Sequence, residues 1–94
     1  MQSHIINTGK MFVIRTNGLE SYLAYRIHGQ ELDLFSAYVP ESLRGSGYAS
    51  ELILHGIHYA VLNGLRVRAN CPAAAAYIKR NPEWNYTFIA LEKV

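Results

Sequence analysis

The sequence contains very little cysteine and no long apolar run. Its one cysteine, Cys71, cannot form a disulfide within the chain. No apolar stretch approaches the ~20 residues that a membrane-spanning helix needs, and residues 1–10 lack the apolar segment of a secretory signal. We therefore expect a cytoplasmic protein in a reducing compartment, with no membrane partner.

The chain also has little excess of positive over negative charge. The formal net charge is +2, and the basic residues are scattered along the chain. Because nucleic-acid binding usually needs a basic patch or stripe, we expect no nucleic-acid partner. The chain has 50% hydrophobic and 17% charged residues, the composition of a soluble globular protein. Its length of 94 residues suits a single domain over residues 1–94 with one modest core.

The first half of the chain has the pattern of an antiparallel meander. Runs rich in β-branched and aromatic residues are separated by the turn signals Asn17-Gly18 and Gly29-Gln30. Leu23, Tyr25 and Ile27 alternate with other residues along one run, so we expect these three side chains to face helices. The pattern predicts strands over Met11–Thr16, Glu20–His28 and Glu31–Val39, and a short edge strand over His4–Ile6.

After Gly47 the hydrophobic period becomes that of a helix, and Gly64 suits its C-terminal cap. The next run predicts a strand over Leu65–Asn70, parallel to the preceding strand because a helix connects the two. A second helix is expected over Ala73–Arg80, and residues 85–91 are expected to form a closing strand. The fold class is α/β, or α+β: a mixed, mostly antiparallel sheet with one βαβ crossover and two helices. The apolar stripe of the first helix contains Ala49, Leu52, Ile53, Gly56, Ile57, Ala60 and Val61.

The stretch VPESLRGSGYAS, residues 39–50, joins a predicted strand to this helix and has the composition of an anion-binding loop. Glycines let the backbone approach a ligand closely, and the helix start leaves N–H groups for an anion. A Walker loop would need Lys and Ser/Thr after Gly47, but Tyr48 and Ala49 follow. A dinucleotide fingerprint would need an acidic residue about 20 positions later, where Arg66 and Arg68 stand. An ordinary turn also accounts for the glycines.

A third pattern, Arg/Gln-x-x-Gly-x-Gly/Ala, is matched by Arg44, Gly47 and Ala49. Here the chain resembles the GCN5-related N-acetyltransferases, and in particular their small single-domain branch with a Cys-Pro step. The resemblance covers about residues 32–86 and implies the mixed sheet of that family, with the pantetheine arm of acetyl-CoA between two diverging strands. The residues that carry it are Val39, Pro40, Leu43, Arg44, Gly45 and Gly47, then Cys71-Pro72, Tyr77 and Asn81-Pro82-Glu83.

The resemblance implies acetyl-CoA as the cofactor and an amine of unknown identity as the acceptor. The reaction it implies is an acetyl transfer, by direct attack of the amine on the thioester. The chain is expected to be a monomer or a weak dimer. The cofactor-binding residues that the resemblance implies are Val39, Leu43, Arg44, Gly45, Ser46, Gly47, Tyr48, Ala49, Asn70, Cys71 and Tyr77.

Cys71, Tyr38 and Ser36 are the candidate catalytic residues. A thiol at a helix start can have a lowered pKa and accept an acyl group. Free cysteine is among the most buried residue types, however, so we expect Cys71 to pack beside the cofactor, with the nucleophile as the alternative. Many relatives carry an acidic residue, a histidine and a threonine where Phe35, Ser36 and Ala37 stand. This departure favours a second hypothesis, a non-catalytic module that binds CoA or acyl-CoA. A third hypothesis is an interaction domain that binds no CoA.

No metal site is expected. His55 and His58 are spaced to share a helix face, but no third ligand stands at a useful spacing.

Overall fold

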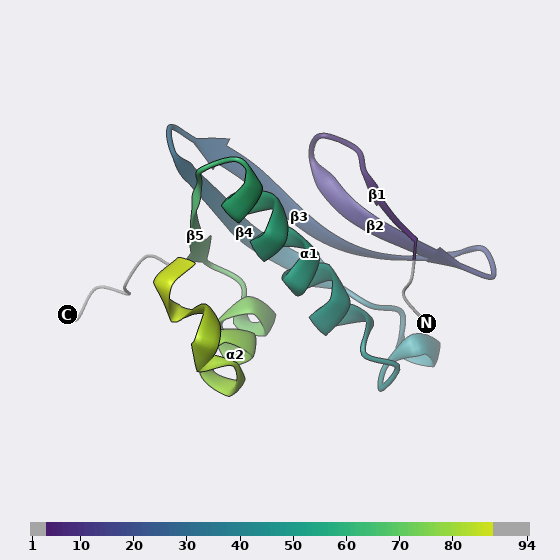
Figure 1. Ribbon diagram of the computed structural model, residues 1–94. Coiled ribbons are helices and arrows are strands. Elements are labelled where there is room, and N and C mark those ends of the chain that lie inside the picture. The colour runs from purple at the N-terminus through teal and green to yellow at the C-terminus, as the bar shows by residue number, and fades with distance from the viewer. Residues whose placement is uncertain (1–3, 88–94) are drawn as a thin grey trace.

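The computed structural model describes residues 4–87 (Figure 1). Its strands form one sheet in the order of the chain, and short 3-10 turns flank the helices. The strands are β1 (Ile5–Asn7), β2 (Met11–Thr16), β3 (Leu19–His28), β4 (Glu31–Tyr38) and β5 (Arg66–Ala69). The helices are α1 (Tyr48–Leu62) and α2 (Pro72–Arg80), and the 3-10 turns are η1 (Glu41–Leu43) and η2 (Pro82–Thr87).

The predicted fold class is confirmed. Strands β1 to β4 pair antiparallel, and β5 pairs parallel to β4 after the crossover through α1. The closing strand is wrong for residues 85–87, which belong to η2; residues 88–91 of that prediction lie outside the described residues. The sequence of η2 begins with Pro82, whose fixed φ suits a helical first turn better than the middle of a sheet.

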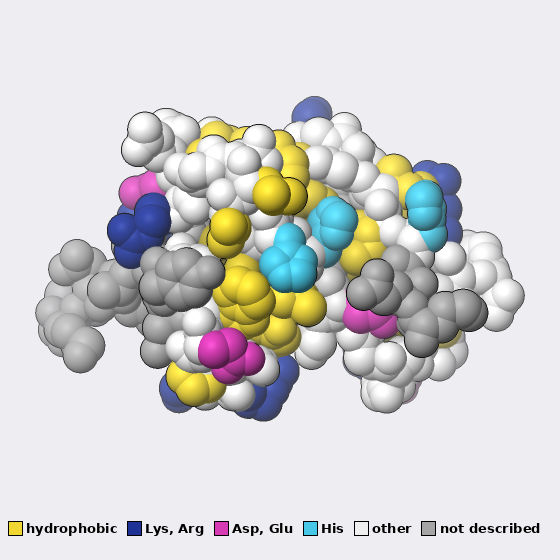
Figure 2. Space-filling view, viewed as in Figure 1, with side chains coloured by type: hydrophobic (Ala, Val, Ile, Leu, Met, Phe, Trp, Pro, Cys, Tyr) yellow, Lys and Arg dark blue, Asp and Glu magenta, His cyan; other side chains and the backbone are white. Residues whose placement is uncertain are grey.

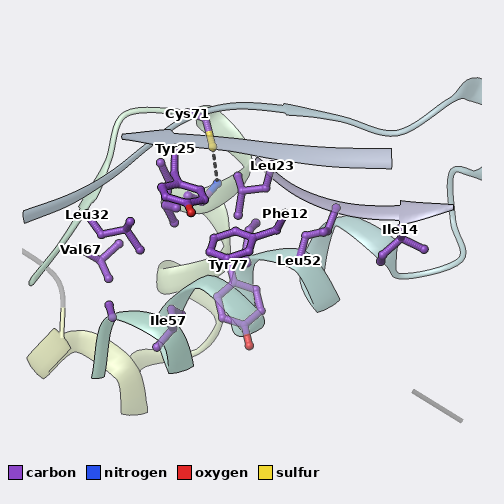
Figure 3. Packing of buried hydrophobic residues seen from close by; sticks show 14 residues of the cluster. Phe12, Ile14, Leu23, Tyr25, Leu32, Leu52, Ile57, Val67, Cys71 and Tyr77 are labelled. Atoms are coloured by element: carbon purple, nitrogen blue, oxygen red, sulfur yellow. Dashed lines mark hydrogen bonds between the residues drawn. The ribbon is translucent and has the colours of Figure 1, made fainter. Parts of the chain in front are cut away.

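Both helices lie on the same side of the sheet, where they build the core. Figure 1 shows α1 crossing in front of the strands with α2 beside it. The strands contribute Phe12, Leu23, Leu32, Leu34 and Val67 to the buried cluster, as the close view of Figure 3 shows in part. The helices contribute Leu52, Ile53, Ile57, Ala60, Ala74 and Tyr77. The opposite side of the sheet carries no helix of the described residues.

An irregularity in β4 changes which face its side chains occupy. Ala24 of β3 pairs with Ser36, but the next residue, Tyr25, pairs with Leu34, so Phe35 is an extra residue in β4. Such a bulge breaks the period of two. At the end of β3, Ile27 pairs with the buried Leu32 and so keeps the expected face, but it is 46% exposed beside the turn at Gly29. The helices therefore cover the middle of β3 but not its end.

The two helices are bounded as the sequence indicates. At the end of α1 the Leu65 N–H donates to the Ala60 carbonyl at 2.8 Å, and the Gly64 N–H donates to the Val61 carbonyl at 3.3 Å. This pair of bonds is a Schellman motif, and Gly64 has the positive φ of +68° that the motif requires. Pro72 occupies the first turn of α2. Neither helix is long and apolar enough to span a membrane, and the same holds throughout the described residues.

Candidate functional site

The loop between β4 and α1 is shaped by two glycines with positive φ. After Pro40 the chain makes the single turn η1, in which the Leu43 N–H donates to the Pro40 carbonyl at 2.9 Å. Gly45 has a φ of +89° and Gly47 a φ of +84°, a region that other L-residues rarely adopt. The glycines of the predicted anion loop therefore reverse the chain immediately before α1.

The start of α1 presents unpaired N–H groups. Gly47 is the N-cap and has no side chain to offer them, and the first intrahelical bond is made by the Glu51 N–H to the Gly47 carbonyl at 3.0 Å. Among residues 4–87, the N–H groups of Tyr48, Ala49 and Ser50 have no acceptor. Together with the positive end of the helix dipole, these donors can bind an anion.

Arg44 closes the loop on itself. Its Nε donates to the Val39 carbonyl at 2.9 Å, which links the end of β4 to the turn before Gly45. This bond uses one nitrogen of the guanidinium and leaves the terminal nitrogens on the exposed side chain for a phosphate. Tyr48 is held from the other side, because the Thr16 hydroxyl donates to its phenolic oxygen at 3.3 Å.

An open cavity of about 560 Å³ lies against this loop. Its walls come from the end of β4, the loop, the first turn of α1 and the start of α2. Most of the predicted cofactor residues line it: Val39, Leu43, Arg44, Gly45, Gly47, Tyr48 and Ala49. Tyr38, predicted as catalytic, lines it as well. The sequence analysis missed Ala37, Ser50 and Ala73, small residues whose only sequence signal is their position beside the predicted loop and helix starts.

The strands that bound the expected pantetheine gap separate at Leu34. The pairing of β4 with β5 ends at Leu34 and Ala69, and the Leu34 carbonyl then accepts both the Asn70 N–H at 2.9 Å and the Cys71 N–H at 3.0 Å. Beyond this point β4 continues to Tyr38 while the chain after β5 turns into α2. The part of β4 from Phe35 to Tyr38 therefore has no β5 partner on that edge.

Cys71 is buried in the core, with 2% of its surface exposed. Its Sγ accepts the Ala74 N–H at 3.4 Å, drawn as the dashed line in Figure 3. Burial raises the pKa of the thiol, and the backbone N–H groups at the start of α2 offset this only in part. Desolvation outweighs the N–H groups, which goes against the nucleophile alternative and agrees with the expectation that Cys71 packs.

Several predicted site residues lie outside the cavity wall. Tyr77 is 7% exposed and packs in the core, and burial raises its pKa. Ser36 pairs with Ala24 on the side of the sheet away from the helices. Asn70 bonds to Asp33 through its side chain, and Ser46 is exposed in the loop. None of these four, nor Cys71, is among the residues that line the cavity.

The described residues contain no group of three His, Cys, Asp or Glu side chains that could hold a metal ion. His55 packs edge-on against Phe12 with ring centroids 5.0 Å apart, and His58 packs edge-on against Trp84 at 5.4 Å. Figure 2 shows histidine side chains beside hydrophobic ones on this helix-bearing side. Both histidines therefore have aromatic partners.

Comparison with known families shows which family the chain belongs to. Residues 11–87 match the family described as GCN5-related N-acetyl-transferase, which is most of the chain. The chain belongs to the GCN5-related N-acetyltransferase family. Members of this family use acetyl-CoA as a co-substrate, and the resemblance predicted from the loop and the Cys-Pro step is confirmed.

The fold agrees with a solved member. The chain is similar to a Staphylococcus aureus protein, solved in solution by NMR and proposed to be a GCN5-like N-acetyltransferase. The two share 21% sequence identity and a TM-score of 0.77, over 97% of this chain and 92% of that one. At this identity the likeness shows the fold alone. No curated protein matches the chain.

Proposed function

We propose that the protein transfers the acetyl group of acetyl-CoA to an amine by direct attack on the thioester. The main support for this proposal is that three structural features lie next to one another. These are the unpaired N–H groups at the start of α1, the cavity beside them, and the point where β4 and β5 separate. A diphosphate, a pantetheine arm and a thioester need these features in this order.

The loop residues fit the diphosphate. The N–H groups of Tyr48, Ala49 and Ser50 donate to its oxygens, and the terminal nitrogens of Arg44 add a charge-assisted contact. A Cβ added at Gly45 or Gly47 would meet no atom within 4 Å, so at both positions the backbone is open to a ligand. The free edge of β4 from Phe35 to Tyr38 can then bind the amides of the pantetheine arm as an added strand.

Acetyl-CoA supplies an activated carbonyl carbon. In direct transfer the amine lone pair forms the N–C bond, the C–S bond breaks, and the amine loses one proton while the thiolate gains one. Tyr38 is among the residues that line the cavity, and its 45% exposed ring lies 5.7 Å from that of Tyr22 on the side of the sheet away from the helices. We propose that its phenol donates the proton to the thiolate from that side. Cys71 does not fit the role of acyl carrier, because burial raises the pKa of its thiol.

The alternative is a module that binds CoA or acyl-CoA without turnover. One observation favours it: the cavity wall contains no carboxylate and no histidine among the described residues. Among the lining residues, Tyr38, Tyr48 and Ser50 carry a hydroxyl. Because general-base catalysis usually relies on His, Asp or Glu, proton removal from the amine would then depend on solvent.

A thermal melt with two ligands tests the binding step. CoA at ~100 times its Kd should stabilise the protein by about 2.7 kcal/mol, and dephosphorylated pantetheine should stabilise it far less because it cannot reach the loop. Equal shifts would contradict the loop assignment. Release of free thiol from acetyl-CoA in the presence of a panel of primary amines then separates the two hypotheses: a binding module shows the CoA shift but no thiol release.

A further inference from the structure

A buried carboxylate lies outside the cavity, on the side of the sheet without helices. Asp33 is 5% exposed, and it stands between Leu32 and Leu34, whose side chains enter the core on the opposite side. Its Oδ2 accepts the Arg26 Nε at 3.1 Å and its Oδ1 accepts the Asn70 Nδ2 at 2.8 Å. Asp33 thus connects β3, β4 and the residue that follows β5.

This arrangement fixes the orientation of the Asn70 amide. An ionised carboxylate only accepts hydrogen bonds, so the NH₂ group of Asn70 must face Asp33. The amide oxygen of Asn70 therefore faces away from it, and the residue is exposed. The backbone is fixed as well, since the Asn70 N–H donates to the Leu34 carbonyl at 2.9 Å. The result is an oriented, exposed acceptor oxygen where β4 and β5 separate.

The cavity and the Asn70 side chain lie on opposite sides of this gap. After Asn70 the chain enters α2, whose Ala73 lines the cavity on the helix side and whose preceding Cys71 packs in the core. Asp33, Arg26 and Phe35 lie on the other side, where the Arg26 guanidinium is 4.3 Å from the centre of the Phe35 ring. A thioester placed in the gap would therefore have the Asn70 side chain and its partner Asp33 on the side without helices.

We propose that the acceptor amine approaches from this helix-free side and donates one N–H to the Asn70 amide oxygen, with Asp33 as the positioning residue. This inference rests on the proposed function. The bond would turn the amine lone pair toward the thioester carbon. An amide oxygen suits this task better than a free carboxylate, because a negative charge would stabilise the unreactive ammonium form. Arg26 pairs with Asp33 and offsets the negative charge.

Substitutions separate the positioning role from a structural one. Asp33→Ala should free the Asn70 amide and lower kcat/KM for the amine about tenfold, as expected for the loss of one hydrogen bond in the transition state, while the Kd for CoA stays unchanged. Asp33→Asn keeps one oxygen, which can accept from the Asn70 NH₂ group, but its own NH₂ group then faces the Arg26 N–H, so this variant should restore only part of the activity. Glu31→Gln is the matched control. Glu31 lies on the same strand as Asp33 and pairs with Arg68 of β5 at 3.0 Å, so this change removes the charge of a neighbouring pair and should leave kcat/KM unchanged.

The decisive measurement is made on Asn70 itself. With CoA bound, titration with benzylamine or ethanolamine should shift the side-chain ¹⁵N–¹H₂ signals of Asn70, and Asn70→Ala should lower amine turnover without weakening CoA. If Asn70 responds to the amine but no amine is acetylated, the inference stands and the transferase proposal fails. If amines are acetylated equally well by Asn70→Ala, or if that variant loses CoA affinity instead, the inference is overturned and the transferase proposal stands. If no amine is acetylated and the Asn70 signals do not shift, both the inference and the transferase proposal are overturned.

Discussion

Gly47 joins the loop to the helix and lines the cavity, and a Cβ there would meet no protein atom within 4 Å. Gly47→Val should abolish CoA binding, since a Cβ would stand where the phosphate approaches, and the positive φ of +84° adds strain of about 1–2 kcal/mol. The protein should still melt cooperatively. Gly9→Val is the control: Gly9 also has a positive φ, +93°, and open space around it, but it lies in the β1–β2 turn. The Gly9→Val variant should lose a similar amount of stability, and calorimetry should show an unchanged affinity for CoA.

Cys71 should carry no acetyl group at any stage. Burial keeps its thiol protonated at neutral pH, and its sulfur already accepts the Ala74 N–H. Intact-mass spectrometry after brief mixing with acetyl-CoA should show no added acetyl mass. Cys71→Ala should lower the free energy of unfolding by about 1–2 kcal/mol and leave most of the turnover. A thioester on Cys71 that forms and decays at the rate of turnover would refute direct transfer.

His55 should make stability depend on pH. Its pKa is lowered, mainly by burial and secondarily by the nearby His58. The unfolded chain therefore takes up the proton at a higher pH than the folded one. Stability should be constant above the ordinary histidine pKa of about 6.5 and should fall as the pH drops from there through the folded value. Urea melts of His55→Gln should show a flatter dependence, and His58→Gln should retain more of it.

At the scale of elements, Gly56 sets how closely α1 approaches the sheet. A Cβ built there would lie 3.5 Å from Leu34 Cδ2, 3.5 Å from Phe12 Cε2 and 3.6 Å from Leu23 Cδ2, which is ordinary contact. Gly56→Ala should therefore raise the free energy of unfolding by about 0.5–1 kcal/mol, the helix preference of alanine over glycine. Gly56→Leu should lower it by more than 1 kcal/mol through overpacking. Urea denaturation checks both, and a large loss in Gly56→Ala would mean that the contact is already tight.

The sequence predicts those elements that depend on local signals. Such signals act within a few residues: the hydrophobic period of α1, the glycine after it, and Pro72 at the start of α2. The predictions based on them are confirmed. The bulge at Phe35 was not predictable in this way, because it is a mismatch between two strands and appears only when their register is known. The predicted strand is wrong over residues 85–87, because a stretch rich in aromatic and β-branched residues does not by itself distinguish a strand from a short helical turn.

For the site, the loop was predictable and the opposite wall was not. A turn that needs positive φ and the start of a helix can both be recognised in the sequence. Arg44, Gly45 and Gly47, which were predicted in this way, line the cavity. Ala37 and Ala73 line it because two strands separate and a second helix turns back, which is a property of the tertiary fold. Asn70 was predicted as a cofactor-binding residue, but its bond to Asp33, 37 positions away, forms only across β4 and β5 and has no signal in the sequence.

At the scale of the whole molecule, one core joins every part that builds the site. The buried cluster draws on β2, β3, β4, β5 and both helices, and α1 runs from this core to the anion loop. Trp84 in η2 packs against the cluster and is the only tryptophan of the chain. Its fluorescence therefore reports on the C-terminal turn, while far-UV circular dichroism reports on the helices and the sheet. If the domain is one cooperative unit, the two signals should change together.

Ile57→Ala tests this unity and its connection to ligand binding. Ile57 is fully buried in the middle of the core, so its truncation should cost about 2–5 kcal/mol and lower a single melting transition seen equally by both signals. The loop lies about 15 Å away along the helix, at 1.5 Å per residue, so the CoA affinity of the folded variant should not change. CoA at ~100 times its Kd should then restore about 2.7 kcal/mol, as in the wild type.

Leu62→Ala, on the same helix but 84% exposed, should change stability by less than about 0.5 kcal/mol. Two separate transitions, or a CoA stabilisation that differs between Ile57→Ala and the wild type, would show that the loop and the core do not unfold together.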